Sequence, residues 1–284
     1  MAKSNVAIVV DSTAYIPPDL VEKYDLTVIP QILILGEEEY RDDVDIRPGE
    51  FYLKMQQSSD FPKTSQATIQ DFKDVFEGLK DKAESILAIV ISGELSGTLN
   101  SATQAKAALP DLNIEIVDSR TIAMALGFIV LAAARAAENG KSLEEVAQVA
   151  RDTIGKVGLI FAVNTLEFLH RGGRIGGARR FLGTALNIKS ILHVEEGKVK
   201  ALDQVRTRKK SLNFVLDEVA KHVEGHKNVR IASLHAASPD DAQFLLEAAS
   251  ERFNPIEALT SEISPVVGAH AGPGTVGLIW SVDI

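Results

Sequence analysis

One histidine, His270, stands in a glycine- and proline-rich segment, residues 263–277, shortly before the C-terminus. The glycines allow unusual backbone dihedral angles and a close approach to a ligand, while Pro265 and Pro273 stiffen the turn. An imidazole held in such a loop can act as a general base or can bind an anion. A structural loop whose histidine caps a neighbouring carbonyl remains the alternative.

Two hydroxyl-bearing segments each precede a helix-like sequence. Ser96 stands at the expected N-cap of a helix, and with Gly97 and Thr98 it could cradle an anion, because a helix start offers unpaired amide donors. Thr64 and Ser65 stand just before a second expected helix. Simple helix capping is the alternative for both segments.

Two basic segments could contact an anionic partner, either a phosphate or an acidic surface. They are HRGGRIGGARR, residues 170–180, and QVRTRKK, residues 204–210. A solvated surface is the alternative for each segment. The formal net charge of −9 argues against wholesale nucleic-acid binding, which requires an excess of lysine and arginine on the binding face.

Other kinds of site lack their sequence signatures. GPGTVG, residues 272–277, matches the dinucleotide-binding pattern, but too little chain follows it for the required helix. Ser96 with His270 suggests an acyl hydrolase, yet GELSG is not the nucleophile-elbow pattern, and no carboxylate is assigned to orient the histidine. The acidic cluster at residues 42, 43 and 45 lacks the glycine and glutamate of a calcium loop. We therefore expect no metal ion and no nucleotide.

Apolar runs alternate with helix-like segments up to about residue 155, which is typical of a parallel sheet with helices on its faces. The expected strands cover residues 6–10, 27–35, 86–91 and 114–117. The expected helices cover residues 51–57, 68–82, 97–109, 122–138 and 143–154. Loops that follow parallel strands gather at the carboxyl edge of the sheet, where ligands usually bind.

The second half combines a hairpin with further helices and strands, which predicts a mixed sheet. Strands 190–194 and 199–205 should form the hairpin, with its turn at residues 195–198. Further strands are expected at residues 158–163, 229–234, 256–263 and 275–282, and helices at 210–222 and 242–253. We predict an α/β protein with two domains, residues 1–155 around a parallel sheet and 156–284 around a mixed sheet.

Composition places the chain among soluble proteins. Its 284 residues are 45% hydrophobic and include no cysteine, which excludes disulfides and thiolate chemistry. The longest apolar stretch, residues 122–134, is shorter than the roughly 20 residues that a bilayer requires, and the N-terminus does not resemble a signal peptide. We expect a cytoplasmic protein.

Six motifs in order make the sequence similar to the DegV family over essentially its whole length. They are VVDST, TSQ, LSGTLNSA, LHRGGRI, VRTRKK and GAHAGPG, beginning at residues 9, 64, 95, 169, 205 and 268. The resemblance implies a two-domain α/β protein that holds a long-chain fatty acid between its domains. It also implies a lipid carrier without catalytic activity, resembling the subunit of bacterial fatty-acid kinase that presents the carboxylate to a separate kinase.

The resemblance assigns roles to the residues noted above. Those implied to converge on the fatty-acid carboxylate are Thr64, Ser65, Ser96, Gly97 and His270. A carboxylate that leaves water needs several donors, and its tail needs an apolar tunnel. Residues implied to lie near the site mouth are Arg171, Arg174 and Arg206, where they would engage the kinase, the acyl phosphate or an anionic membrane.

Two alternatives remain for the function: an acyl hydrolase of the Ser/His type, or a non-catalytic regulatory protein that senses lipid. The sequence also departs from the family pattern at two places. Ala67 follows TSQ where many members have proline, and Ser92 is followed by Gly93 and Glu94 where many have a serine doublet. We expect Glu94 to face solvent, because inside the site it would repel a carboxylate. The protonation state of His270 stays open, because a nearby carboxylate and burial act in opposite directions.

Overall fold

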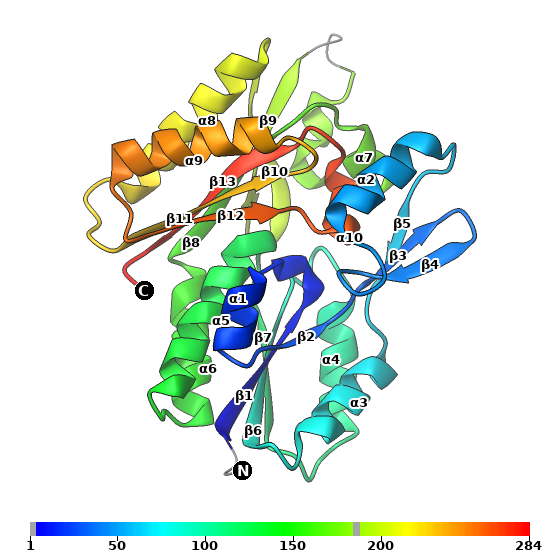
Figure 1. Cartoon of the computed structure of the whole chain (residues 1–284), viewed down its shortest axis with the longest axis vertical. Coiled ribbons are helices and arrows are strands. Elements are labelled where there is room, and N and C mark those ends of the chain that lie inside the picture. Colours follow the sequence, from blue (N-terminus) through cyan, green and yellow to red (C-terminus); the bar gives the residue numbers. More distant parts are fainter. Residues whose placement is uncertain (1–3, 184–187) are drawn as a thin grey trace.

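The computed structural model describes residues 4–183 and 188–284, and over these residues the strands form three sheets (Figure 1). The first sheet is parallel, in the order β2-β1-β6-β7. Its strands are β1 (Ser4–Asp11), β2 (Thr27–Ile29), β6 (Ala83–Val90) and β7 (Ile114–Asp118). β6 reads as a nearly continuous apolar run because helices cover both faces of the sheet.

Helices pack on the two faces of this sheet and build two separate apolar layers. On one face lie α3 (Ile69–Leu79) and α4 (Thr98–Ala107), with Phe72 and Phe76 buried against the sheet. The other face carries α5 (Ala123–Glu138) and α6 (Leu143–Ile154). α1 (Pro18–Lys23) connects β1 to β2. The prediction of a parallel α/β sheet in the first half is confirmed.

A small antiparallel sheet, in the order β4-β3-β5, was not predicted. It consists of β3 (Ile32–Leu35), β4 (Glu38–Arg41) and β5 (Lys63–Ser65), and α2 (Pro48–Gln57) lies between β4 and β5 in the chain. The single strand expected at residues 27–35 is wrong, because the chain breaks at Pro30 into β2 and β3, which join different sheets. Proline cannot donate the backbone hydrogen bond that a continuous inner strand requires.

The third sheet is mixed and has the order β10-β9-β8-β13-β11-β12. Its strands are β8 (Val157–Val163), β9 (Lys189–Glu195), β10 (Lys198–Val205), β11 (Val229–His235), β12 (Glu257–Glu262) and β13 (Val276–Val282). α8 (Arg208–Val223) and α9 (Pro239–Phe253) cover one face. The predicted hairpin is confirmed, and Glu196 and Gly197 take the positive φ angles that a two-residue hairpin turn favours.

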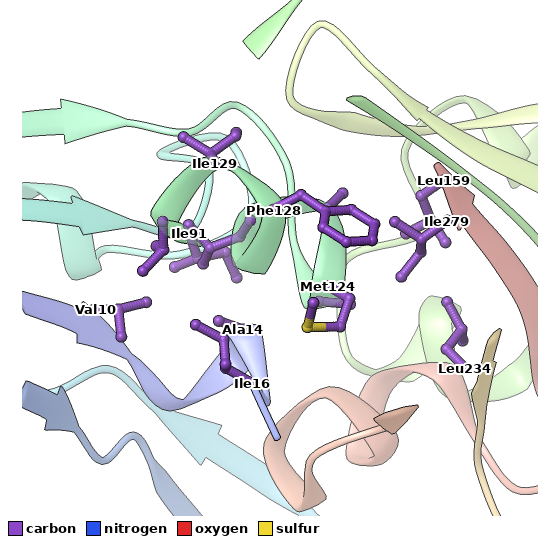
Figure 2. Packing of buried hydrophobic residues seen from close by; sticks show 14 of the residues in the cluster. Val10, Ala14, Ile16, Ile91, Met124, Phe128, Ile129, Leu159, Leu234 and Ile279 are labelled. Atoms are coloured by element: carbon purple, nitrogen blue, oxygen red, sulfur yellow. The ribbon is translucent and has the colours of Figure 1, made fainter. Parts of the chain in front are cut away.

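α5 lies between the parallel sheet and the mixed sheet and joins their cores. Almost every residue of this helix is buried, as expected for a helix that is apolar on all sides. Met124 and Phe128 lie between Val10 of the parallel sheet and Leu159 of the mixed sheet (Figure 2). The predicted boundary near residue 155 falls between α6 and β8, but because one core joins the two sheets, the division into domains stays a prediction.

Two short helices complete the fold: α7 (Glu167–Arg171) and α10 (Pro265–Ala271). Two 3-10 turns accompany them, at Ser12–Ala14 and Gly176–Phe181. Across the two described stretches, each helix is too short or too polar to cross a bilayer.

Candidate functional site

An apolar cavity with one polar end lies between the carboxyl edge of the parallel sheet and the mixed sheet. The empty space in and in front of it, open solvent included, is about 870 Å³. The apolar walls include Ile91, Ile122, Leu159, Phe161, Leu169, Val194, Val199, Leu234, Ile263 and Val266. The polar side chains at the cavity include Gln31, Thr64, Ser65, Ser96, Arg174 and His270. The structure therefore brings together four of the five residues implied to bind the carboxylate, and one of the three arginines.

His270 lies on α10, so its predicted placement in a loop is wrong. Ser264 caps the helix by accepting a hydrogen bond from the Val267 backbone, and Pro265 occupies the first turn, where no backbone donor is needed. Gly272, with φ of 78°, ends the helix. The prolines and glycines of this segment therefore delimit a helix, and this helix fixes the imidazole against β5.

The imidazole of His270 is neutral. Burial, assisted by the positive charge of Arg174, lowers its pKa to about 4. Its Nε2 lies 2.8 Å from Thr64 Oγ1. Its buried Nδ1 has no hydrogen-bond partner within residues 4–183 and 188–284, and it lies so close to Gly172 that a methyl group there would overlap it.

This arrangement assigns the ring proton of His270 to Nε2, because a proton on Nδ1 would be a buried donor without an acceptor. The Nε2–H group then donates to Thr64 Oγ1, and the Thr64 hydroxyl keeps its own proton for a group in the cavity. In the unliganded site, burial therefore favours the neutral imidazole.

Ser96 does not cap the following helix, contrary to prediction. The N-cap of α4 is Gly97, which has no side chain with which to cap. Ser96 Oγ instead lies 2.8 Å from Thr98 Oγ1 and accepts a hydrogen bond of 3.3 Å from the Thr98 backbone. Gly97 itself is not part of the cavity wall; its Cα faces the side chain of Gln66.

Arg174 brings positive charge to the cavity and is held there by the backbone. Its Nε donates to the Leu95 carbonyl at 3.1 Å, and its Nη1 donates to the Gly172 carbonyl at 2.8 Å. These two bonds fix the guanidinium close to the residues that would meet an anion.

Arg171 and Arg206 do not line the cavity. Arg171 is exposed, pairs with Glu167 at 3.2 Å and lies over the ring of Phe61. Arg206 is exposed in the turn between β10 and α8.

The two departures from the family pattern have clear structural partners. Glu94 faces outward, as expected, and pairs with Lys198 at 3.1 Å. The Ala67 backbone N–H donates to Gln31 Oε1 at 3.0 Å, a bond that proline could not make. Ser65 lines the mouth but is exposed, and its hydroxyl donates weakly to the Gln66 carbonyl.

Gln31 lines the polar end and bonds to Thr98 behind it. Sequence reasoning placed Thr98 in the expected anion cradle with Ser96 but missed Gln31. Gln31 is 3% exposed, and its carboxamide bonds to Thr98 and Ala67. The available signal was a single amide side chain inside the apolar run VIPQILIL. A buried polar side chain of this kind requires hydrogen-bond partners, so its presence predicts contacts with other polar groups of the fold.

Within the residues that the structure describes, no group of three or more histidine, aspartate or glutamate side chains is placed to hold a metal ion. The acidic residues 42, 43 and 45 belong to the turn after β4, where Arg41 pairs with Asp45 at 2.9 Å.

Comparisons with known proteins agree with the architecture. Residues 5–283 match the model of a family described as uncharacterised protein, DegV family. A DegV domain-containing protein of Clostridium perfringens is 36% identical over 281 residues, covering 97% of this chain and 98% of the relative. Protein DegV of Bacillus subtilis is 30% identical over 277 residues, covering 97% and 99%.

Solved structures with the same fold carry descriptions of what they bind. A DegV family protein from Thermus thermophilus, described by its fatty-acid binding, has a TM-score of 0.93 and 36% identity, with 98% of this chain and 100% of that chain covered. DegV from Bacillus subtilis, described as a fatty acid binding protein, has a TM-score of 0.90 and 30% identity, covering 99% and 100%. A stearic acid-binding protein from Eubacterium ventriosum has a TM-score of 0.90 and 25% identity, covering 98% of each chain.

Proposed function

The chain belongs to the DegV family, and from this premise we propose that it binds a long-chain fatty acid, with the acyl tail in the cavity and the carboxylate at the polar end. The observation that carries the proposal is the convergence of hydroxyl donors, Thr64 and Ser96, beside an arginine at one end of an otherwise apolar cavity. Family members of the same fold are described as fatty-acid binders, which supports the same ligand class.

The polar end matches the hydrogen-bonding needs of a carboxylate, which only accepts. Thr64 Oγ1 accepts a hydrogen bond from His270 Nε2–H and can therefore donate its own hydroxyl proton. Ser96 offers a second hydroxyl at the cavity, and Arg174 supplies positive charge. Charge-assisted hydrogen bonds are the strong ones, so these donors would fix the orientation of the head group.

The apolar walls would supply most of the affinity. Burying an acyl chain yields about 0.8 kcal/mol per methylene, so a 16-carbon tail gains on the order of 10 kcal/mol before the cost of association. In this arrangement the tail gives affinity and the head group gives orientation.

The geometry favours a carrier over a hydrolase. Ser96 pairs with Thr98, whereas His270 pairs with Thr64, so the imidazole is not placed to activate Ser96 as a nucleophile. In the described part of the chain, no carboxylate contacts His270 Nδ1, and an imidazole with a pKa near 4 is a weak base at neutral pH. We propose that the protein is a cytoplasmic carrier with no cofactor besides the fatty acid.

A separate kinase is the partner that this role calls for, because a carrier that holds the carboxylate near the cavity mouth can present it for acyl-phosphate formation. Exposed Arg171 and Arg206 are the residues that we propose for contact with that kinase, with the acyl phosphate or, transiently, with an anionic membrane. A regulatory lipid sensor would bind the same ligand without passing it to a kinase.

Lipid uptake tests the proposal directly. We expect mass spectrometry of the purified protein to detect bound fatty acid, and the delipidated protein to take up added palmitate or oleate in a one-to-one complex. Absence of both endogenous lipid and uptake would exclude a fatty-acid carrier. Hydrolysis of acyl esters that is lost in Ser96→Ala would establish the hydrolase instead, and uptake without acyl-phosphate formation by an added fatty-acid kinase would favour the sensor.

Gly172→Ala should weaken fatty-acid binding without a comparable loss of stability. The new methyl group would overlap His270 Nδ1 and displace the imidazole that orients Thr64. Backbone strain does not contribute, because Gly172 has φ of −75° and ψ of −6°, which alanine adopts readily. We expect about a tenfold rise in Kd, measured by displacement of a fluorescent fatty acid, since one hydrogen bond to a charged group is worth about that much.

Gly155→Ala is the matched control for this substitution. Gly155 has nearly the same backbone angles, φ of −76° and ψ of −4°, and nothing lies within 4 Å of the position of a new methyl group. Its Kd should stay at the wild-type value. Equal affinities for the Gly172 and Gly155 variants would contradict the placement of the head group beside His270.

A further inference from the structure

A buried amide joins the two segments that carry the cavity hydroxyls. Gln31 lies between β2 and β3, is 3% exposed and reaches the cavity wall. Its Oε1 accepts from the Ala67 backbone at 3.0 Å, two residues after β5, the strand that carries Thr64 and Ser65. Its Nε2 donates to Thr98 Oγ1 at 3.0 Å, at the start of α4 beside Ser96. One side chain therefore sets the spacing between the two hydroxyl segments.

The hydrogen bonds of Gln31 have a fixed direction. Because a backbone N–H can only donate, Ala67 assigns the oxygen of the amide to its own side and the nitrogen to Thr98. Thr98 Oγ1 thus accepts from Gln31 and has one proton of its own to donate. Ser96 Oγ, at 2.8 Å, is a closer acceptor for that proton than Gln31 Oε1, at 3.3 Å.

The direction of this relay determines what Ser96 can do. Its Oγ accepts from the Thr98 hydroxyl and from the Thr98 backbone, so both acceptor positions of the hydroxyl are used. The remaining capacity of Ser96 is to donate its own proton. A donor without acceptor capacity suits a carboxylate, whereas a hydroxyl or amide head group would leave one of its own donors unpaired there.

We propose that Gln31 is a positioning residue that, through Thr98, makes Ser96 a dedicated donor and so gives the cavity its preference for a carboxylate over an uncharged head group. The inference rests on the proposed function, because it concerns the head group of the same ligand. Gln31 acts on selectivity by orienting protons in other residues, whereas the tail is bound by the apolar walls.

A double-mutant cycle tests the relay. Gln31→Leu and Thr98→Val each remove its polar atoms at nearly constant volume, and the double variant removes both. Binding of palmitate and of 1-hexadecanol, which share the tail, is measured by competition against a fluorescent fatty acid, with thermal melting as a check on folding. Thr103→Val is the control, because its hydroxyl bonds to the Leu99 carbonyl on an exposed part of the same helix.

We expect each single variant to lose about tenfold in palmitate affinity and less than about twofold in hexadecanol affinity, as for the loss of one oriented donor to a charged group. The double variant should lose no more than either single variant, because both interrupt one relay. If Gln31→Leu fails to fold, the ratio of palmitate to hexadecanol affinity in Thr98→Val still tests whether the relay favours the carboxylate.

If the variants lost equal affinity for the acid and the alcohol, Gln31 would have a purely structural role. Additive losses of palmitate affinity in the double variant, or an unchanged palmitate affinity in the single variants, would overturn the relay. A wild-type protein that binds hexadecanol as tightly as palmitate would also overturn the inference while leaving the apolar cavity intact. A wild-type protein that binds neither ligand would overturn the proposed function itself, and the inference with it.

Discussion

Thr64→Val is expected to raise the Kd for a long-chain fatty acid by about 10- to 100-fold. A hydrogen bond to a charged group is worth about 1.5–3 kcal/mol, and about 1.4 kcal/mol corresponds to a factor of ten in Kd. The substitution removes the hydroxyl that would donate to the carboxylate. It also leaves His270 Nε2–H without its acceptor at 2.8 Å, so two groups of the site are affected at once. Valine keeps the shape and the strand propensity of threonine, and β5 should persist.

The measurement is a titration of delipidated protein with fluorescent or isotope-labelled fatty acid. Thr260→Val is the control, since Thr260 is an exposed residue of β12 and undergoes the same chemical change in a strand. The NMR signals of the His270 ring should shift in Thr64→Val and stay unchanged in the control. If the Thr64 variant bound fatty acid like the wild type, the carboxylate would have to lie elsewhere in the cavity.

The sequence predicted those helices and strands whose local spacing of apolar residues and capping residues determines their structure. Residues 143–154 form a helix with the predicted bounds, because apolar spacing and a Ser142 capping box agree. The small sheet was missed for the opposite reason. β4 reads EEYR and is largely exposed, and β5 has three residues, so neither shows an alternation of apolar and polar side chains. Their pairing with β3 is a tertiary effect that local sequence does not encode.

The candidate site was predictable as a set of residues, and its geometry was not. Hydroxyls before helices and the family motifs indicated Thr64, Ser96 and His270, and the structure brings all three to one cavity. The contact of His270 with Thr64 depends on α10, whose glycines and prolines suggested a loop. Gln31 was missed because its importance comes from partners that lie far away in the sequence, Ala67 and Thr98.

Asp42→Asn should remove a contribution to the free energy of unfolding that is lost as the pH rises. Asp42 is 1% exposed, accepts a 2.6 Å hydrogen bond from Ser12 Oγ, and has one carboxylate oxygen without a partner among the described residues. Burial raises its pKa to about 7, although the hydrogen bond from Ser12 and the nearby polar groups of Ser264 and Val266 act against that rise. Because Ser264 and Val266 begin α10, this carboxyl group lies beside the start of the helix that carries His270.

The sign follows from proton binding. Between about pH 4 and 7 the folded protein keeps a proton on Asp42 that the unfolded chain has lost, so the free energy of unfolding falls as pH rises through this window and levels off above it. A pKa raised from 3.8 to about 7 corresponds to about 4 kcal/mol at most. Asparagine does not ionise, so in urea titrations at about pH 4 and pH 8 the variant should lose less stability than the wild type.

Asp45→Asn is the control for this experiment. It makes the same substitution at an exposed carboxylate whose pKa is shifted in the opposite direction. Its pKa is lowered to about 2 by hydrogen bonds from Arg41, so this group stays ionised across the whole window and its replacement should leave the pH slope unchanged. Asp11 is also buried with a raised pKa, so a contribution of the same sign should survive in Asp42→Asn and be removed when both residues are replaced. His270, with its pKa lowered to about 4, contributes a slope of the opposite sign in the same window, so the decisive quantity is the difference between the variant and the wild type. If the stability of Asp42→Asn changed with pH just as that of the wild type does, Asp42 would be ionised in the folded state.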